Sequence, residues 1–209
     1  MKNWLFCGRM LLMIRKEAYH MGNYTVIAEV GQALVQLLRE KLCPDIIFSP
    51  ENIGLCAPSD KGDTILGLHL YNIHENREIR GVQMRDEDPT SQRYPSLYLT
   101  LCYMVTAYSK ADLKFRAIEN HRIMGKVIET FQDHSVLETD VLGPANRGAG
   151  LQLHIELLNP NMEDQRKIWN GPEQDFQMSL FYAVSPVELE STRKRRIQRV
   201  VDMDMGVKE

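Results

Sequence analysis

The sequence predicts a single α+β domain in which two long helices pack on a mixed, mostly antiparallel sheet. Several stretches are apolar with the two-residue period of a β-strand, and two longer ones repeat apolar residues every three to four positions. A chain of 209 residues can bury a sizeable core but would be cramped as two domains. The predicted strands are residues 64–73, 97–108, 151–158 and 176–184, and the predicted long helices are residues 24–42 and 111–131.

The N-terminal residues 1–20 fit no common targeting segment. Their apolar run is interrupted by Arg9 and is too short to span a membrane, and no small-residue cleavage site follows it. The codons for residues 16–18 can contain a ribosome-binding sequence, and Met21 follows at a suitable distance. We therefore expect residues 1–20 to be a non-native or peripheral extension with translation starting at Met21, residues 21–190 to be the domain, and residues 191–209 to be an exposed basic tail.

The first half of the domain contains one clear helix and one long charged segment. Residues 24–42 have an apolar stripe, and Pro44 ends the helix. Residues 46–48 are a possible edge strand, and residues 64–73 alternate as a strand. Residues 75–93 show no periodicity and carry charges of both signs. A loop of this length in a compact domain is usually functional or mobile.

Residues 94–137 form the unit around which the rest is expected to fold, with the strand 97–108 running into the helix 111–131. Both faces of the strand are apolar and β-prone, which predicts a central strand covered on both sides. Ser109, with Asp112 three residues later, is typical of a helix start. The helical stripe includes His121, which we interpret as a hydrogen-bonded core residue.

The second half continues with shorter elements. Residues 136–142 are a possible short strand, residues 143–150 a glycine-rich loop, and residues 151–158 a strand whose Leu151, Leu153, Ile155 and Leu157 point inward and whose His154 faces solvent. A short helix is expected at residues 162–169 with Asn159 as its cap. After the strand 176–184, Pro186 restricts the next segment to an edge or an exit from the sheet. The residues expected in the core are Leu99, Leu101, Tyr103, Val105, Val127, Leu153, Ile155 and Leu180.

Composition and motifs exclude several functional classes. A net charge of -3 with 25% charged residues exerts no global attraction to nucleic acid or to anionic membranes. The four cysteines have no C-x-x-C or zinc spacing, so we interpret them as reduced thiols in a cytoplasmic protein. His74-Glu75 would begin a zinc-protease motif, but position 78 is Glu78 rather than histidine. The sequence therefore predicts no enzyme, no metal and no cofactor.

Three segments carry a family resemblance: P-S-L-Y-L-T-L-C-Y-M-V-T-A-Y at residues 95–108, H-R-I-M-G-K-V-I-E-T-F-Q-D-H-S-V-L at residues 121–137, and the late W-N-G with S-L-F-Y-A-V-S-P-V-E-L. Together they resemble the N-terminal domain family of tail-terminator, or cap, proteins of phage-tail-like contractile injection systems of the virulence-cassette and antifeeding-prophage kind. The resemblance covers residues 24–189. It implies a structural assembly protein that caps the inner tube and sheath, with itself, as a hexameric ring, and the sheath and tube proteins as partners. It also implies a protein that is cytoplasmic before it joins the particle, without contact to a membrane.

The charged loop and tail supply the candidate protein contacts, which are Arg77, Arg80, Arg85, Asp86, Glu87, Asp88, Arg193, Lys194, Arg195, Arg196 and Arg199. Two alternatives stay open. One is an enzyme whose scattered site combines the carboxylates of residues 86–88 with His121. The other is a nucleic-acid-binding module that uses the basic tail, since clustered cations release counterions from a phosphate backbone. No aromatic residues interleave these cations, which favours a solvated or protein-docking tail over nucleic acid.

Overall fold

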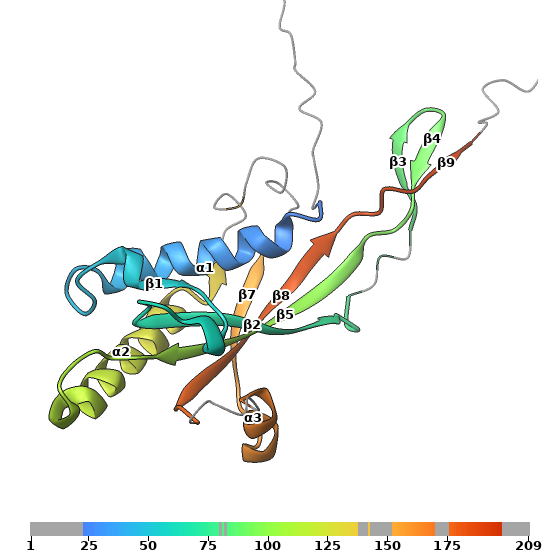
Figure 1. The fold of residues 1–209 in the computed structure, drawn as a ribbon. Helices are drawn as coiled ribbons and strands as arrows, with labels where there is room; N and C mark the ends of the chain where they lie inside the picture. Colours follow the sequence, from blue (N-terminus) through green and yellow to red (C-terminus); the bar gives the residue numbers. More distant parts are fainter. Residues whose placement is uncertain are drawn as a thin grey trace, which may run out of the picture.

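The computed structural model describes residues 23–79, 81, 83–137, 142, 152–169 and 176–197 (Figure 1). The helices are α1 (Val26–Leu42), α2 (Leu113–Asp133) and α3 (Met162–Ile168). The strands are β1 (Ile53–Leu55), β2 (Leu66–Glu75), β3 (Arg85–Asp88), β4 (Ser91–Arg93), β5 (Leu97–Ala107), β6 (Val136–Leu137), β7 (Leu153–Leu158), β8 (Ser179–Leu189) and β9 (Lys194–Arg196). The expected extension at residues 1–20 and the glycine-rich loop at residues 143–150 lie outside the described residues.

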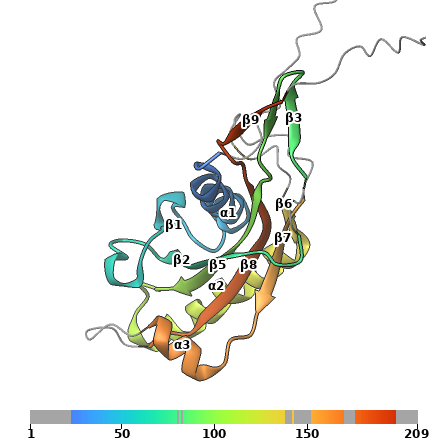
Figure 2. The ribbon, with the colours of Figure 1, turned by 90° about the vertical axis from the view of Figure 1, so that its right-hand side faces the viewer.

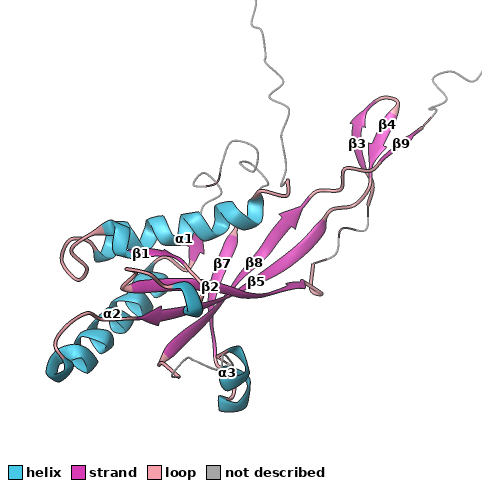
Figure 3. Cartoon of the chain, in the orientation of Figure 1, coloured by secondary structure: helices cyan, strands magenta, loops and turns pink. Residues whose placement is uncertain are grey.

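The described strands form two sheets. The main sheet has the order β1-β2-β5-β8-β7-β6, and the small sheet has the order β3-β4-β9. In the main sheet β1 runs parallel to β2, and all other neighbours are antiparallel. β5 lies between β2 and β8, as expected of a central strand. These features confirm the α+β class with a mixed, mostly antiparallel sheet (Figure 3).

The main core lies between the sheet and the two long helices. α1 buries one stripe, and α2 adds the side chains of its C-terminal half, where the Phe131 ring packs edge-on against Tyr182 of β8. The opposite face of β5 packs under α3, where Met104 and Tyr108 meet Trp169. β5 is therefore covered on both faces, as predicted. Of the eight residues expected in the core, seven are buried and Leu180 is partly buried against them.

The interpretation of His121 as a core residue is wrong, because His121 is exposed. The buried residues of α2 are Ile123, Met124, Val127, Thr130 and Phe131, all in its second half. The first half of the helix extends past the sheet, so Leu113 is 81% exposed although its position continues the core stripe. A helical apolar period predicts which face a helix presents, whereas the extent of the sheet decides how much of that face is covered.

The start of α2 and the cap of α3 differ from the prediction, whereas α3 begins at Met162 as predicted. α2 begins after Asp112, whose side chain makes no capping bond. The Ser109 hydroxyl instead accepts a hydrogen bond from the Ala111 N–H at 3.0 Å, which closes the turn before the helix. In α3 the cap is Asn161 and not Asn159, because the Asn161 side-chain oxygen accepts from the Asp164 N–H at 2.9 Å.

One strand prediction is wrong in place, and another is wrong in the direction of one side chain. Residues 46–48 form no strand, because the Ile46 and Ile47 amides both bond back to the Leu42 carbonyl; the edge strand is β1. Leu157 of β7 is 43% exposed rather than inward-facing.

β8 continues past Pro186 instead of ending at residue 184. Ser185 and Pro186 lie at an irregularity where the β5 partner shifts from Leu101 to Leu99. The recorded pairing with β7 stops at Ser185, so the rest of β8 pairs with β5 alone. The segment after Pro186 is therefore an edge of the sheet, as expected. Proline has no backbone N–H, and at an edge no neighbouring strand requires that hydrogen bond.

Candidate protein-interaction surface

The small sheet extends from one end of the molecule, beyond the ends of β5 and β8 that feed into it (Figures 1 and 2). Residues 75–93 were expected to be a loop, and this is wrong for their second half, since β3 and β4 form an antiparallel hairpin there. β9, from the basic segment, pairs antiparallel with β4. The two charged segments, which lie far apart in the sequence, thus form one structural element.

The turn of the hairpin explains why the chain reverses at this point. The Asp88 carboxylate accepts hydrogen bonds from the Thr90 N–H at 2.7 Å and from the Thr90 and Ser91 hydroxyls. Aspartate followed by proline, with hydroxyl residues next, is a common turn sequence. These hydrogen bonds lower the pKa of Asp88 to about 2. The Asp88-Pro89 pair was the local signal that could have revealed the hairpin.

Cross-strand partners define the two faces of the small sheet. Asp86, Gln92 and Arg195 share one face, and Gln92 donates to the Asp86 carboxylate at 2.8 Å. Arg85, Arg93 and Lys194 share the other.

Ion pairs connect the hairpin to β9 and to the end of β8. Glu87 lies 2.5 Å from Arg93 and 2.8 Å from Lys194, and Arg93 also pairs with Glu190. The hydrogen bond from Lys194, with that from Arg93, lowers the pKa of Glu87. Arg193 stacks on the Tyr94 ring at 4.3 Å. Surface pairs of this kind are individually weak, so they fix the arrangement of these strands more than they stabilise the domain.

A half-buried ion pair anchors the small sheet to the main one. Arg85 of β3 lies 2.9 Å from the Glu188 carboxylate of β8, whose side chain is only 2% exposed. The Tyr98 hydroxyl of β5 donates to the same carboxylate at 3.3 Å, and burial, followed by the negative charge of Glu188, raises the pKa of Tyr98. This carboxylate therefore depends on Arg85 and Tyr98 for its compensation.

The predicted contact residues divide into three groups. The first group is engaged inside the small sheet or with the body, and it consists of Arg85, Asp86, Glu87, Asp88, Arg193 and Lys194. Arg77, Arg195 and Arg196 have exposed side chains. Arg80 and Arg199 lie outside the described residues. The structure thus places most of the predicted contacts on one element, and it assigns several of them an internal role that the sequence did not reveal.

The scattered enzyme site is not assembled. His121 lies on α2, while Asp86, Glu87 and Asp88 lie on β3 at the other end of the molecule (Figure 1). Within the described residues, no cluster of three metal-binding side chains occurs, and no helix has the length and apolarity needed to cross a membrane. The described cysteines, Cys43, Cys56 and Cys102, are free thiols, and burial raises the pKa of each.

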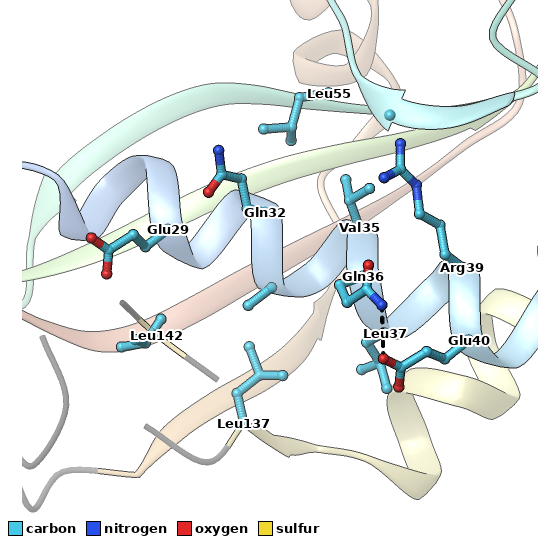
Figure 4. Close-up of a pocket in the computed structure, with 12 residues that line it drawn as sticks. Glu29, Gln32, Val35, Gln36, Leu37, Arg39, Glu40, Leu55, Leu137 and Leu142 are labelled. Atoms are coloured by element: carbon cyan, nitrogen blue, oxygen red, sulfur yellow. Dashed lines mark hydrogen bonds between the residues drawn. The ribbon is translucent and has the colours of Figure 1, made fainter. Parts of the chain in front are cut away.

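A second surface feature is a groove of about 830 Å³ along the outer side of α1 (Figure 4). Its walls come from the two edges of the main sheet, with Leu55 of β1 on one side and Leu137 of β6 on the other. Its floor is formed by α1, which contributes both polar and apolar side chains, and Gln36 donates to Glu40 at 2.8 Å there. The groove has apolar walls and a mixed floor, and its lining residues present no arrangement of nucleophile and base.

Comparisons with known proteins agree with this fold. A PVC sheath/tube terminator of an extracellular contractile injection system, in the extended state, is 17% identical over 88% of this chain, with a TM-score of 0.59. The anti-feeding prophage cap (AFP tube terminating cap) is 19% identical over 85% of this chain, with a TM-score of 0.60. The matched regions make up 63% and 60% of those two proteins, so this chain spans less than two thirds of their length. At these identities the likeness shows the fold.

A comparison with curated proteins finds no match. The model of the Pvc16 N-terminal domain family matches residues 29–202, which include most of α1, both sheets and α2. The chain therefore belongs to the Pvc16 N-terminal domain family.

Proposed function

We propose that this protein is a structural terminator that caps the inner tube and sheath of a phage-tail-like contractile injection particle. The observation that carries the proposal is the fold, which the chain shares over more than four fifths of its length with a sheath/tube terminator and a tube-terminating cap. Membership of the Pvc16 N-terminal domain family supports the same role. The protein folds in the cytoplasm and then becomes part of the particle.

The working form in this proposal is a homohexameric ring whose partners are itself and the sheath and tube proteins. A contractile tail of this class has sixfold symmetry. A protein that closes its end makes equivalent contacts with every protomer below only by matching that symmetry, and head-to-tail contacts that close on themselves produce such a ring. The small sheet, which carries charges of both signs, projects from the body of the molecule (Figure 1). In the proposed ring this sheet contacts the neighbours.

Protein contact is favoured over the nucleic-acid alternative by the surroundings of the basic residues. Lys194 is paired with Glu87, and the Arg193 guanidinium is stacked on Tyr94. The carboxylates of β3 lie in the same small sheet. A phosphate backbone prefers a continuous cationic track, whereas alternating signs suit a protein partner.

The proposal is tested by deleting the gene from its operon and imaging the particles. Loss of a terminator is expected to leave tubes and sheaths of uncontrolled length or with unstable ends. Supplying the parent gene in trans restores capped particles of normal length. A matched pair of variants controls for folding: Leu97→Asp, at a 41% exposed position of β5, restores capping, whereas Leu101→Asp, at a fully buried one, does not. Particles of normal length with intact caps in the deletion strain would rule out this function.

A further inference from the structure

A pocket of about 610 Å³ lies between α1 and the neighbouring edge of the main sheet. It is lined by the first two turns of α1 with Tyr24 just before them, by the end of β1 with the two residues after it, by the first half of β2, and by Tyr103 of β5. Among the described lining residues it shares only Leu55 with the groove along the outer side of α1, so the two are separate features. Sites for small molecules typically have volumes of roughly 300–1,000 Å³.

The lining of this pocket carries no charge. None of its described residues is an aspartate, glutamate, lysine or arginine, and Ile27, Leu68 and Leu70 supply apolar surface. Burial lowers the pKa of His69 and raises the pKa of Cys56, so both stay uncharged at neutral pH. An ionic ligand would lose its hydration here and would meet no opposite charge. The pocket therefore suits an uncharged, largely apolar molecule.

One hydroxyl that lines the pocket has no hydrogen-bond partner. Tyr103 is only 1% exposed, and its hydroxyl makes no hydrogen bond within the part of the chain that the structure describes. Burial raises the pKa of Tyr103, so the hydroxyl keeps its proton and remains a donor. A buried hydroxyl without a partner costs free energy, and a ligand that brings an acceptor recovers it.

The surroundings of Gly31 place this hydroxyl at the wall of the pocket. A Cβ on Gly31 would lie 3.1 Å from a methyl carbon of Leu55 and 3.4 Å from the Tyr103 hydroxyl oxygen. The three residues thus meet at one point, and all three line the pocket. Leu55 is 48% exposed, and exposed side chains change rotamer within nanoseconds. Movement of the Leu55 side chain gives a ligand access to the hydroxyl.

We propose that this pocket binds an uncharged, largely apolar small molecule whose carbonyl oxygen accepts a hydrogen bond from the Tyr103 hydroxyl. The apolar part of the ligand packs between Ile27 of α1 and Leu70 of β2. The carbonyl of a ketone, an ester or an amide supplies the acceptor without adding a charge. Binding is a property of the isolated protein and is independent of the proposed terminator function.

Three related probes test the chemistry of the pocket in an NMR titration of the full chain. Benzylacetone is an apolar ketone, propylbenzene lacks the carbonyl, and hydrocinnamate carries a carboxylate in place of the ketone. Benzylacetone is expected to shift the amide signals of Gly31 and Leu55 in a saturable way. Propylbenzene should bind roughly five-fold more weakly, because it forms no hydrogen bond. Hydrocinnamate should give no saturable shift, because the lining offers its charge no partner.

Two tyrosine variants and one glycine variant separate the hydroxyl from the cavity. Tyr103→Phe should bind benzylacetone roughly five-fold more weakly than the parent and no better than propylbenzene. Tyr182→Phe is the matched control, because the Tyr182 hydroxyl is also buried and unpartnered among the described residues but does not line this pocket; it should bind benzylacetone like the parent. Gly31→Ala places a methyl group beside the hydroxyl and should weaken binding of both neutral probes. Circular dichroism of each variant checks that the domain is folded.

The possible outcomes differ from those of the gene deletion. Equal affinity of the parent and Tyr103→Phe for benzylacetone would overturn the role of the hydroxyl, and the absence of saturable shifts with benzylacetone would overturn the site. If the parent does not bind benzylacetone but Tyr103→Phe attaches poorly to particles, the pocket belongs to a protein contact, and this inference is wrong. Each of these results leaves the terminator function standing, since that function depends on the length and caps of particles in the deletion strain.

Discussion

At the scale of single residues, the centre of β5 is the least tolerant place in the described chain. Leu101 has no exposed surface and lies on the face that packs under the two long helices. Leu97 lies four residues earlier on the same face but is 41% exposed, because it is at the end of the strand. The two leucines therefore form a matched pair that differs mainly in burial.

We expect Leu101→Asp to unfold the protein. An unpaired carboxylate at this position costs roughly 4 kcal/mol or more, because it loses its hydration and finds no partner in an apolar core. Leu97→Asp should cost far less, since its carboxylate reaches water. Urea denaturation followed by circular dichroism measures both. Equal midpoints for the two variants would mean that the assignment of β5 as the central strand is wrong.

The Arg85–Glu188 pair gives a second prediction at this scale. Arg85→Ala removes the cation from a carboxylate that is 2% exposed and leaves it only the Tyr98 hydroxyl, so we expect a loss of about 1–3 kcal/mol in unfolding free energy. Glu188→Gln should cost less, because a neutral amide needs no counter-charge. In the double variant the two losses should not add. Additive losses in urea denaturation would show that the pair does not couple.

At the scale of elements, the small sheet differs from the main sheet in what holds it together. Its strands are three or four residues long and its side chains are mostly exposed, so burial contributes little. It relies on backbone pairing and on ion pairs such as Lys194 with Glu87, which are 107 residues apart in the chain. Its stability should therefore depend on pH in a way that the main sheet does not share.

We expect β9 to separate from β4 in acid before the main sheet opens. The pKa of Glu87 is lowered in the folded protein, chiefly by the hydrogen bond from Lys194. A lowered pKa stabilises the folded state above the unfolded pKa of about 4.3, and that contribution is lost as pH falls through the folded pKa. The turn at Asp88 loses its stabilising hydrogen bonds at lower pH, because the pKa of that carboxyl is about 2. Hydrogen exchange of the Ile197 amide, compared with an amide of β5, measures this; equal protection of both at every pH would contradict it.

At the scale of the whole molecule, folding and assembly are assigned to different parts. The two long helices and the main sheet contain the main core, and the small sheet lies outside it. Removal of residues 191–209 deletes β9, all three residues of which are exposed. We expect an almost unchanged Tm for the domain but weaker attachment to the particle.

Calorimetry and co-sedimentation with particles measure these two effects. A chain that ends at residue 197 is the matched control, because it keeps β9 and its partners in β4. A large fall in Tm after removal of residues 191–209 would show that the segment packs as part of the domain.

The sequence by itself determined those elements whose apolar residues recur in the pattern of a strand or a helix, because that pattern reflects which side chains are buried. β5 is apolar on both faces because both are covered, and α1 has a stripe because one side packs on the sheet, so each was predictable from its own residues. The charged residues of the candidate surface were also identifiable, one segment at a time.

Only the tertiary structure decided how those charged segments meet. Polar, exposed strands have no regular pattern of apolar residues by which the sequence could reveal them. The pairing of β4 with β9 depends on contacts between residues about a hundred positions apart. The structure likewise decided that His121 is exposed, because α2 extends past the sheet that would have covered it. Local patterns report the environment of a segment, whereas the meeting of distant segments depends on the path of the whole chain.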